Sequence, residues 1–263
     1  MDLGLKDKIA FVAASSRGLG AATARQLARE GAKVVINSRD AARLNTTADS
    51  IRQETGAQVL AVVGDVNSVT DIERMIGETG RHFGGLDILV TNSGGPPAGR
   101  FDDFDDEAWQ GATNAMLMGT VRMIRTALPH LRQSKAASVL AITSVSTKQP
   151  LPNLILSNSI RLAVIGLIKS LALELGNEGI RFNSILPTFT ETERVIELMA
   201  HRAKQNGTTV EEEIKKQAAS SPLGRMGTPQ EFGNVAAFLC SPAASYLTGA
   251  MLSFDGGTYK GTL

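Results

Sequence analysis

The chain has 263 residues, of which 43% are hydrophobic, 27 are basic and 26 are acidic, and its formal net charge is +1. This length is enough for one large α/β domain with a substantial core. The even charge balance provides no long-range field for nucleic acid or for an anionic membrane, so it favours a small-molecule partner. The single cysteine, Cys240, cannot form an internal disulfide and is interpreted as a core thiol.

The first residues show no targeting pattern. The chain starts Met-Asp-Leu-Gly, without a basic region followed by an apolar one. No run of apolar residues approaches the ~18 that a membrane span needs. We therefore expect a cytoplasmic protein without a membrane partner.

Residues 8–31 are typical of a phosphate-binding unit. Residues 8–14 predict a short apolar strand, residues 15–20 a glycine-bearing turn, and residues 21–30 an alanine-rich helix closed by Gly31. A strand that enters a helix in this way leaves unpaired N–H groups at the helix start, where the macrodipole also favours an anion. On their own, Gly18 and Gly20 could equally serve close packing of the helix on the strand.

The next predicted strand, residues 33–37, indicates which dinucleotide is bound. It ends about 20 residues after the glycine turn, where a dinucleotide fold brings the adenosine ribose. An acidic side chain there would accept from a free 2′-hydroxyl, but Ser38 and Arg39 follow the strand instead. Arg39, together with Arg17 in the turn, offers cationic forks suited to a 2′-phosphate. The sequence therefore favours NADP(H) over NAD(H).

Helix and strand patterns alternate through the rest of the chain. The expected helices cover residues 41–55, 68–83, 105–133, 154–175 and 230–240. The expected strands cover residues 58–63, 86–91, 139–143, 180–186 and 251–254. This rhythm predicts a doubly wound parallel sheet in a single domain that spans residues 1–263. One connection, residues 188–221, is long and polar, and we expect this lid segment to be mobile over a site.

Two of these segments have further implications. Asp65 follows a strand and either accepts from an adenine amino group or caps the next helix together with Asn67 and Ser68. The helix at residues 154–175 is apolar almost all round, so it needs the sheet against one side and another cover on the other. A two-fold copy of the same helix would provide that cover, which predicts a homo-oligomer, a dimer or a tetramer.

Three motifs carry a family resemblance over essentially the whole chain. Residues 13–20 read Ala-Ala-Ser-Ser-Arg-Gly-Leu-Gly, residues 91–94 read Thr-Asn-Ser-Gly, and residues 222–257 end in Asp-Gly-Gly. They resemble the Thr-Gly-x-x-x-Gly-x-Gly motif, the Asn-Asn-Ala-Gly motif and the C-terminal signature of the short-chain dehydrogenase/reductase family, particularly its 3-oxoacyl-carrier-protein reductase-like branch. The resemblance implies a Rossmann-type sheet of seven strands, a tetramer in most members, and hydride transfer between NAD(P)(H) and a carbonyl carbon.

The resemblance also implies which residues hold the cofactor. They are Ser15, Ser16, Arg17, Gly18, Leu19, Gly20, Arg39, Asp65, Val66, Asn92, Gly94, Arg161, Pro187, Thr190 and Thr192. Two positions depart from the family pattern. Ala14 replaces the first glycine of the cofactor turn, and Thr188 stands where the family has the glycine of its Pro-Gly.

The catalytic positions implied by the resemblance are only half retained. The family uses an Asn on the long central helix, a Ser after the fifth strand, and a Tyr-x-x-x-Lys pair on the following helix. Asn114 and Ser144 match the first two, whereas Ser157 and Arg161 occupy the places of the Tyr and the Lys. Ser144 could instead cap the end of its strand, and Asn114 could bond the backbone of its helix.

The two replacements change the chemistry that the site can do. A tyrosine, with an ordinary pKa of about 10, can be driven toward ionisation by a neighbouring lysine and so act as general acid or base. A serine hydroxyl does not ionise at neutral pH without a strong base beside it. Arg161 can supply the charge and the hydrogen bonds to the ribose, but it does not release a proton readily. Ser157 and Arg161 still share one helix face, so the binding geometry can survive the loss of the proton-transfer group.

No other residue stands out as a replacement proton donor. Tyr259 near the chain end could reach a site, but packing or exposure is its more ordinary role, as it is for His201 and Glu191 in the lid segment. No side chains show the spacing of metal ligands.

Two functions follow from these residues. The first is an NADP(H)-dependent oxidoreductase that acts on a small carbonyl or alcohol substrate with an altered acid/base group. The second is an NADP(H)-binding sensor or partner subunit without hydride chemistry; a lyase or isomerase on the same fold is a third possibility.

Overall fold

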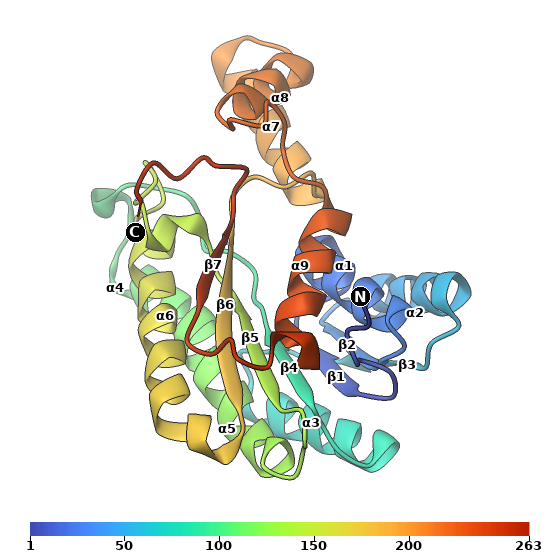
Figure 1. The fold of residues 1–263 in the computed structure, drawn as a ribbon. Helices are drawn as coiled ribbons and strands as arrows, with labels where there is room; N and C mark the ends of the chain where they lie inside the picture. The colour runs from blue at the N-terminus through green and yellow to red at the C-terminus, as the bar shows by residue number, and fades with distance from the viewer. Residues whose placement is uncertain (263) are drawn as a thin grey trace.

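Seven parallel strands form the centre of the structure, a computed structural model that describes residues 1–262 (Figure 1). They are β1 (Ile9–Val12), β2 (Lys33–Ser38), β3 (Val59–Val63), β4 (Ile88–Thr91), β5 (Ser138–Ile142), β6 (Arg181–Pro187) and β7 (Met251–Phe254). Their order is β3-β2-β1-β4-β5-β6-β7. The predicted Rossmann-type sheet of seven strands is therefore confirmed.

Helices cover both faces of this sheet (Figure 1). One face carries α1 (Gly18–Arg29), α2 (Ala41–Thr55) and α9 (Pro229–Cys240). The other carries α3 (Val69–Phe83), α5 (Gly119–Leu131) and α6 (Ile155–Leu175). Cys240 is fully buried in the first of these layers, and burial raises the pKa of its thiol to about 12, so the expected core thiol is present.

Successive side chains of β1 pack alternately into the two helix layers. Phe11 is fully buried among the residues of the second layer, whereas Ala10 and Val12 face the first. Phe11 pairs with Val35 of β2 on one side and with Leu89 of β4 on the other. The strand order reverses between β1 and β4, and in such sheets a crevice opens at the carboxyl ends of the strands at this point.

The segment over residues 105–133 differs from the single helix expected from the sequence. The region expected to be one helix over residues 105–133 consists of α4 (Asp106–Thr113), a π-helical turn (Asn114–Met118) and α5. The π-helical turn covers only five residues inside an otherwise helical region, so the sequence pattern does not reveal it. Helix α1 also begins at Gly18, three residues earlier than expected, because the glycine turn contributes to its first turn.

The lid segment is mainly helical, whereas the sequence predicted a connection. It contains α7 (Glu193–Asn206) and α8 (Val210–Ala219), which stand apart from the sheet in Figure 1. The side chains of Thr192 and Thr209 cap these helices, and Glu212 completes a capping box at the start of α8. Their polar composition arises because most of each helix surface faces solvent.

Helix α6 packs one face on the sheet and leaves another uncovered. Val164 and Ile168 are buried in the second layer, whereas Leu162 and Leu173 are 52% and 76% exposed. By length and composition alone, Ile155–Glu178 is apolar enough to cross a membrane, so the expectation that no stretch comes near such a span is wrong. Core helices of soluble proteins pass the same test, and this helix has a sheet against one side.

Gly20 provides a test of the packing between α1 and the turn after β1. A Cβ at this position would lie 2.5 Å from the Ala14 carbonyl oxygen and 2.9 Å from the Cα of Ser15, both backbone atoms. We therefore expect Gly20→Ala to lower the free energy of unfolding by about 1–3 kcal/mol, measured by urea denaturation. Gly111→Ala in α4 is the control, because a Cβ there meets open space; it should cost nothing and gain up to ~1 kcal/mol of helix propensity. Equal unfolding midpoints for the two variants would contradict this reading of Gly20.

Candidate functional site

A cleft of about 1620 Å³ opens at the carboxyl ends of the strands and extends to α7. It is lined by most of the residues that the sequence selected. The expected cofactor-binding residues in its lining are Ser16, Arg17, Gly18, Leu19, Arg39, Asp65, Val66, Asn92, Gly94, Pro187, Thr190 and Thr192. The expected catalytic residues in its lining are Ser144, Ser157 and Arg161. The fold therefore brings 15 of the 18 selected residues to one surface.

Ser15 and Gly20 are the two cofactor candidates that do not line the cleft. Ser15 is fully buried, and its hydroxyl donates to the Val12 carbonyl at 2.6 Å and accepts from the Asn37 N–H at 3.0 Å. Gly20 permits the close approach of α1 to Ala14. Both residues stabilise the shape of the turn without facing the cleft. The surroundings of Gly20 therefore support the interpretation that this glycine serves close packing of the helix.

Asn114 also lies outside the cleft lining. Its side-chain oxygen accepts from Nη1 of Arg122 at 2.7 Å, and the same nitrogen donates to the Asn67 carbonyl at 3.2 Å. The sequence had allowed a backbone partner for Asn114, but the partner that the structure gives it is a side chain. Ala115, the next residue of the π-helical turn, is the one that lines the cleft.

The turn between β1 and α1 is shaped to receive a phosphate. Ala14 has a φ of +47°, in the left-handed region that favours glycine, the residue that the family motif has at this position. Arg17, the N-cap of α1, makes no capping hydrogen bond with its side chain, and the first turn contains no acidic residue. The helix start therefore presents N–H groups without a competing side-chain partner.

Across the cleft, Thr190 supplies an observation of a different kind. Its residue is 2% exposed, and its hydroxyl has no hydrogen-bond partner within residues 1–262. A buried hydroxyl without a hydrogen-bond partner lowers the stability of the fold, unless a ligand forms the missing hydrogen bond. Together with the open helix start, it fits a phosphate-bearing dinucleotide held between the turn and the segment after β6.

At the end of the cleft where the sequence places the adenosine, Arg39 lies beside a carboxylate. Nη1 of Arg39 lies 3.7 Å from a carboxylate oxygen of Asp65, and the Arg39 side chain is 76% exposed. Asp65 accepts from the Asn67 N–H at 2.9 Å, while Ser68 caps α3 by accepting from Asp71. Asp65 is thus not the cap of that helix, and its contact with an adenine stays a prediction.

Ser157 and Arg161 lie together on α6, as their spacing predicts. Nε of Arg161 donates to the Ser157 hydroxyl at 3.2 Å. Nη1 of the same side chain donates to the carbonyls of Ile142 at 3.3 Å and Thr143 at 3.1 Å, at the end of β5. Burial, with repulsion from Arg194, lowers the pKa of Arg161 to about 10. The guanidinium therefore remains charged at neutral pH and does not act as the base that would ionise Ser157.

Ser144 combines the two interpretations that the sequence left open. Its hydroxyl oxygen accepts from the Ser146 N–H at 3.1 Å and so caps the short 3₁₀ turn that follows β5. The same residue lines the cleft. Because that oxygen accepts in the cap, its O–H remains able to donate to a ligand.

The other candidate proton donors fall in different places. His201 lines the cleft from α7, whereas Glu191 does not. Tyr246 is fully exposed, and the Tyr259 ring lies 5.3 Å from Nζ of Lys148, outside the cleft lining. No group of three or more His, Cys, Asp or Glu residues able to hold a metal ion occurs within residues 1–262.

Several cleft residues were not selected from the sequence, and Arg194 is the most prominent. Its guanidinium lies over Gly95: a Cβ built on that glycine would be 2.6 Å from Nη2. Arg100 and Arg202 line the cleft as well, and Arg202 stacks on the Phe189 ring at 5.4 Å from its centre. No local motif distinguishes these arginines from those of a solvated helix, because only the fold brings α7 to the loop after β4.

Comparison with known proteins gives consistent matches over nearly the whole chain. A family described as enoyl-(acyl carrier protein) reductase matches residues 13–259. The dehydrogenase/reductase SDR family member 4 of Sus scrofa is 34% identical over 255 residues, which are 97% of this chain and 88% of that relative.

Solved structures with the same architecture include two that contain NADPH. L-sorbose reductase from Gluconobacter frateurii, complexed with NADPH and L-sorbose, has a TM-score of 0.95 at 32% identity, and the match covers 99% of this chain and 100% of that one. A short chain oxidoreductase from Pseudomonas aeruginosa, NADPH-bound and containing an atypical catalytic center, has a TM-score of 0.89 at 28% identity and covers 98% of this chain and 100% of that one.

Proposed function

The chain belongs to the short-chain dehydrogenase/reductase family of NAD(P)-dependent oxidoreductases, and we propose that it uses NADP(H) to interconvert a small carbonyl compound and its alcohol through an altered proton-transfer site. The observation that carries this proposal is the position of Ser144 in the same cleft as the hydrogen-bonded pair of Ser157 and Arg161. A site that only bound a nucleotide would not need a free hydroxyl donor at Ser144. The NADPH complexes of the two similar oxidoreductases support the choice of cofactor.

Each residue of this site has a chemical role in the proposal. When bound, the nicotinamide supplies the hydride for the carbonyl carbon. Ser144 donates a hydrogen bond to the carbonyl oxygen, and Ser157 donates a second one. The charge of Arg161 stabilises the negative charge that develops on that oxygen.

The proton for the product alcohol comes from water. Arg161 stays charged, and Ser157 has no base beside it, so neither is an independent acid at neutral pH. Asn114 lies outside the cleft lining but next to Ala115, which lines it, and we assign Asn114 the ordering of a water between the cleft and solvent, since its amide N–H₂ remains able to donate while Arg122 holds its oxygen.

A second function, that of an NADP(H) sensor or a non-catalytic partner subunit, is favoured by the bonding of Arg161. Two of its hydrogen bonds go to the carbonyls of Ile142 and Thr143, which is a structural task rather than a catalytic one. The two functions differ in turnover and not in binding. Fluorescence titration with NADPH followed by a panel of ketones separates them, because tight binding without turnover of any ketone would overturn the oxidoreductase proposal.

Restoring the family pair should raise carbonyl reduction. We expect Ser157→Tyr combined with Arg161→Lys to increase kcat on ketones by about 100-fold, because a tyrosine beside a lysine supplies the general acid that is missing. Ser157→Tyr alone is the matched control and should gain less. A double variant that folds, binds NADPH and reduces ketones no faster than the parent protein would contradict the assignment of this site.

Arg39 should determine the choice between the two cofactors. We expect Arg39→Ala to weaken NADPH binding by about 10- to 100-fold, the loss of one or two charge-assisted hydrogen bonds to a 2′-phosphate, while NADH binding changes little. Arg81→Ala, an exposed arginine on α3, is the control. Equal losses for NADPH and NADH, measured by fluorescence titration, would remove the argument for the 2′-phosphate.

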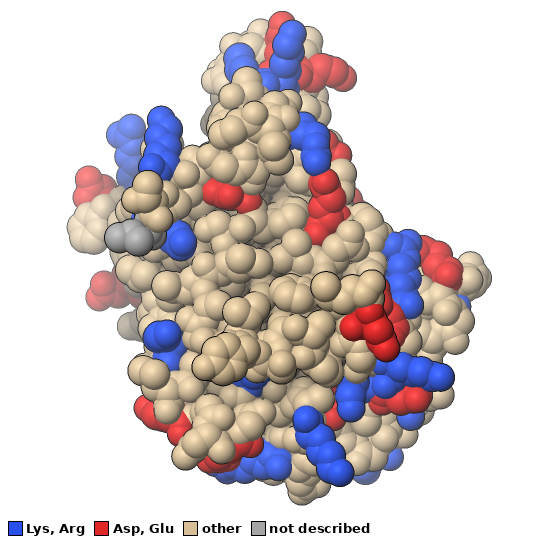
Figure 2. Space-filling model, in the orientation of Figure 1, with Lys and Arg blue, Asp and Glu red and all other residues tan. Residues whose placement is uncertain are grey.

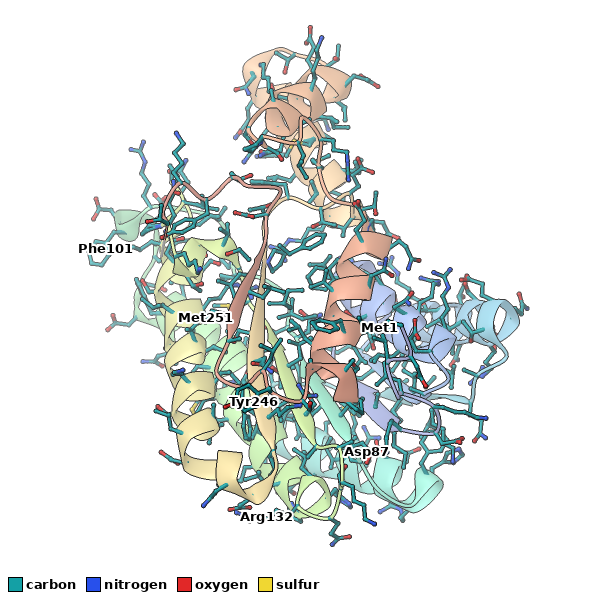
Figure 3. The ribbon with its side chains drawn as sticks, in the orientation of Figure 1. Met1, Asp87, Phe101, Arg132, Tyr246 and Met251 are labelled. Atoms are coloured by element: carbon teal, nitrogen blue, oxygen red, sulfur yellow. The ribbon has the colours of Figure 1, made fainter. Side chains whose placement is uncertain are left out.

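We also propose that a second copy of the chain covers α6 and β7. Strand β7 is the edge of the sheet, and the face around it is almost free of charged side chains in Figure 2. Tyr246 and Met251, labelled on this side of the molecule in Figure 3, are 101% and 43% exposed. An apolar edge strand and an apolar helix face are both surfaces that proteins cover.

The oligomer should depend on the exposed face of α6. We expect the parent protein to be a dimer or tetramer by light scattering, and Leu173→Asp to shift it toward smaller species because a carboxylate cannot be buried there without a partner. Val69→Asp, at an apolar position on α3 that is 48% exposed, should leave the mass unchanged. A monomeric parent protein would overturn this proposal.

A further inference from the structure

The charges of the cleft are not balanced along its length. Seven arginines and four carboxylates line it, although the whole chain has a net charge of only +1. The excess of positive charge in one cavity therefore exceeds that of the molecule. Where this excess lies indicates what the cavity receives besides the cofactor.

At the adenosine end, arginine and carboxylate are paired. Arg39 lies 3.7 Å from Asp65, Arg43 lies 3.7 Å from Asp40, and Arg17 lies 3.6 Å from Glu193. These pairs are exposed, so a phosphate can compete for the guanidinium groups. In the proposal, the phosphates of the cofactor are thus bound by the arginines at this end and by the N–H groups at the start of α1.

At the end that holds Ser144 and Ser157, the arginines have no such partners. Within residues 1–262, no carboxylate forms an ion pair with Arg161, Arg194 or Arg202. Arg161 donates to Ser157 and to backbone carbonyls, and Arg202 donates to Gln217 at 3.1 Å. Asp103 is the one carboxylate of the lining near Arg100, and it accepts from the Arg100 backbone N–H.

Arg194 and Arg161 line the same cleft and carry the same charge. Arg194 reaches from the start of α7 to the Gly95 backbone, and its charge contributes to the lowered pKa of Arg161. Two like charges that face one cavity without a counter-charge are unfavourable, and an anion between them relieves the repulsion. Guanidinium groups bind carboxylate or phosphate oxygens through two parallel N–H donors.

We propose that the substrate of this cleft carries an anionic oxygen group close to the reacting carbonyl, and that Arg194 is the residue that binds it. The proposal rests on the oxidoreductase function above and adds the class of substrate. Arg161 keeps its place beside Ser157, while Arg194, on the lid segment, links substrate binding to the position of α7. A neutral ketone of the same size lacks the group that relieves the repulsion and binds less well.

Pairs of ketones in which the anionic group is either esterified or removed test this proposal. We would compare acetoacetate with ethyl acetoacetate, and dihydroxyacetone phosphate with dihydroxyacetone, using NADPH and the full chain. We expect kcat/KM for the anion of at least one pair to exceed that of its neutral partner by about 10- to 100-fold, the range of a charge-assisted hydrogen bond. The pair that responds also distinguishes a carboxylate from a phosphate.

The variant Arg194→Gln should abolish the preference for the anion, chiefly through KM, and Arg194→Lys should retain part of it. Arg81→Gln on α3 is the control and should keep the full preference. Equal rates for anion and neutral partner, or a preference that survives in Arg194→Gln, would overturn the proposal. A loss of NADPH affinity in Arg194→Gln with an unchanged preference would also overturn it, because Arg194 would then hold the cofactor.

A binding measurement keeps the test independent of turnover. Calorimetric titration of the complex with NADP⁺ should show that the anion binds at least tenfold more tightly than its neutral partner, and that Arg194→Gln removes the difference. If the anion binds more tightly but no substrate turns over, the proposed function is rejected and the anion site is still supported. Turnover without any difference in binding or rate would support the function and reject the anion site.

Discussion

The close approach of α1 to the turn after β1 is the constraint on which the cleft depends. Gly20 allows the helix to lie against the Ala14 carbonyl, and Ala14 accepts a left-handed backbone in order to make the turn. Ser15 fixes the same turn from below through Val12 and Asn37. Because these contacts are made by buried atoms, the start of α1 points its N–H groups into the cleft before any ligand arrives.

At Ser157 and Arg161, too, hydrogen bonds within the protein fix the shape of the cleft. In the family pattern this pair moves a proton, whereas here the arginine ties α6 to the end of β5 and to the serine. The arginine thus retains the positive charge of the site and gives up the exchangeable proton. In the proposed reaction, chemistry at this site depends on hydrogen-bond donors and fixed charge, which stabilise the developing oxyanion and need no titrating group.

The sequence predicted the sheet, the glycine turn and the shared face of Ser157 and Arg161, because each of these depends on local periodicity or on short spacing. It did not predict the π-helical turn at Asn114, since that turn covers only five residues of an otherwise helical region. The helix start at Thr209 did have a signal, the Thr and Glu of a capping box. The position of Arg194 had none, because its contact with Gly95 joins segments that are distant in the chain.

The chain before α7 and the chain after α8 meet at one place. Thr190 forms an isolated β-bridge with Gly227, and the Glu191 N–H donates to the Gly227 carbonyl at 2.9 Å. Everything between these residues, including α7 and α8, is therefore an excursion that leaves the sheet and returns to the place where it left. Such an excursion can be remodelled without disturbing the strands below it, so selection can alter what the cleft accepts while the glycine turn after β1 stays constant.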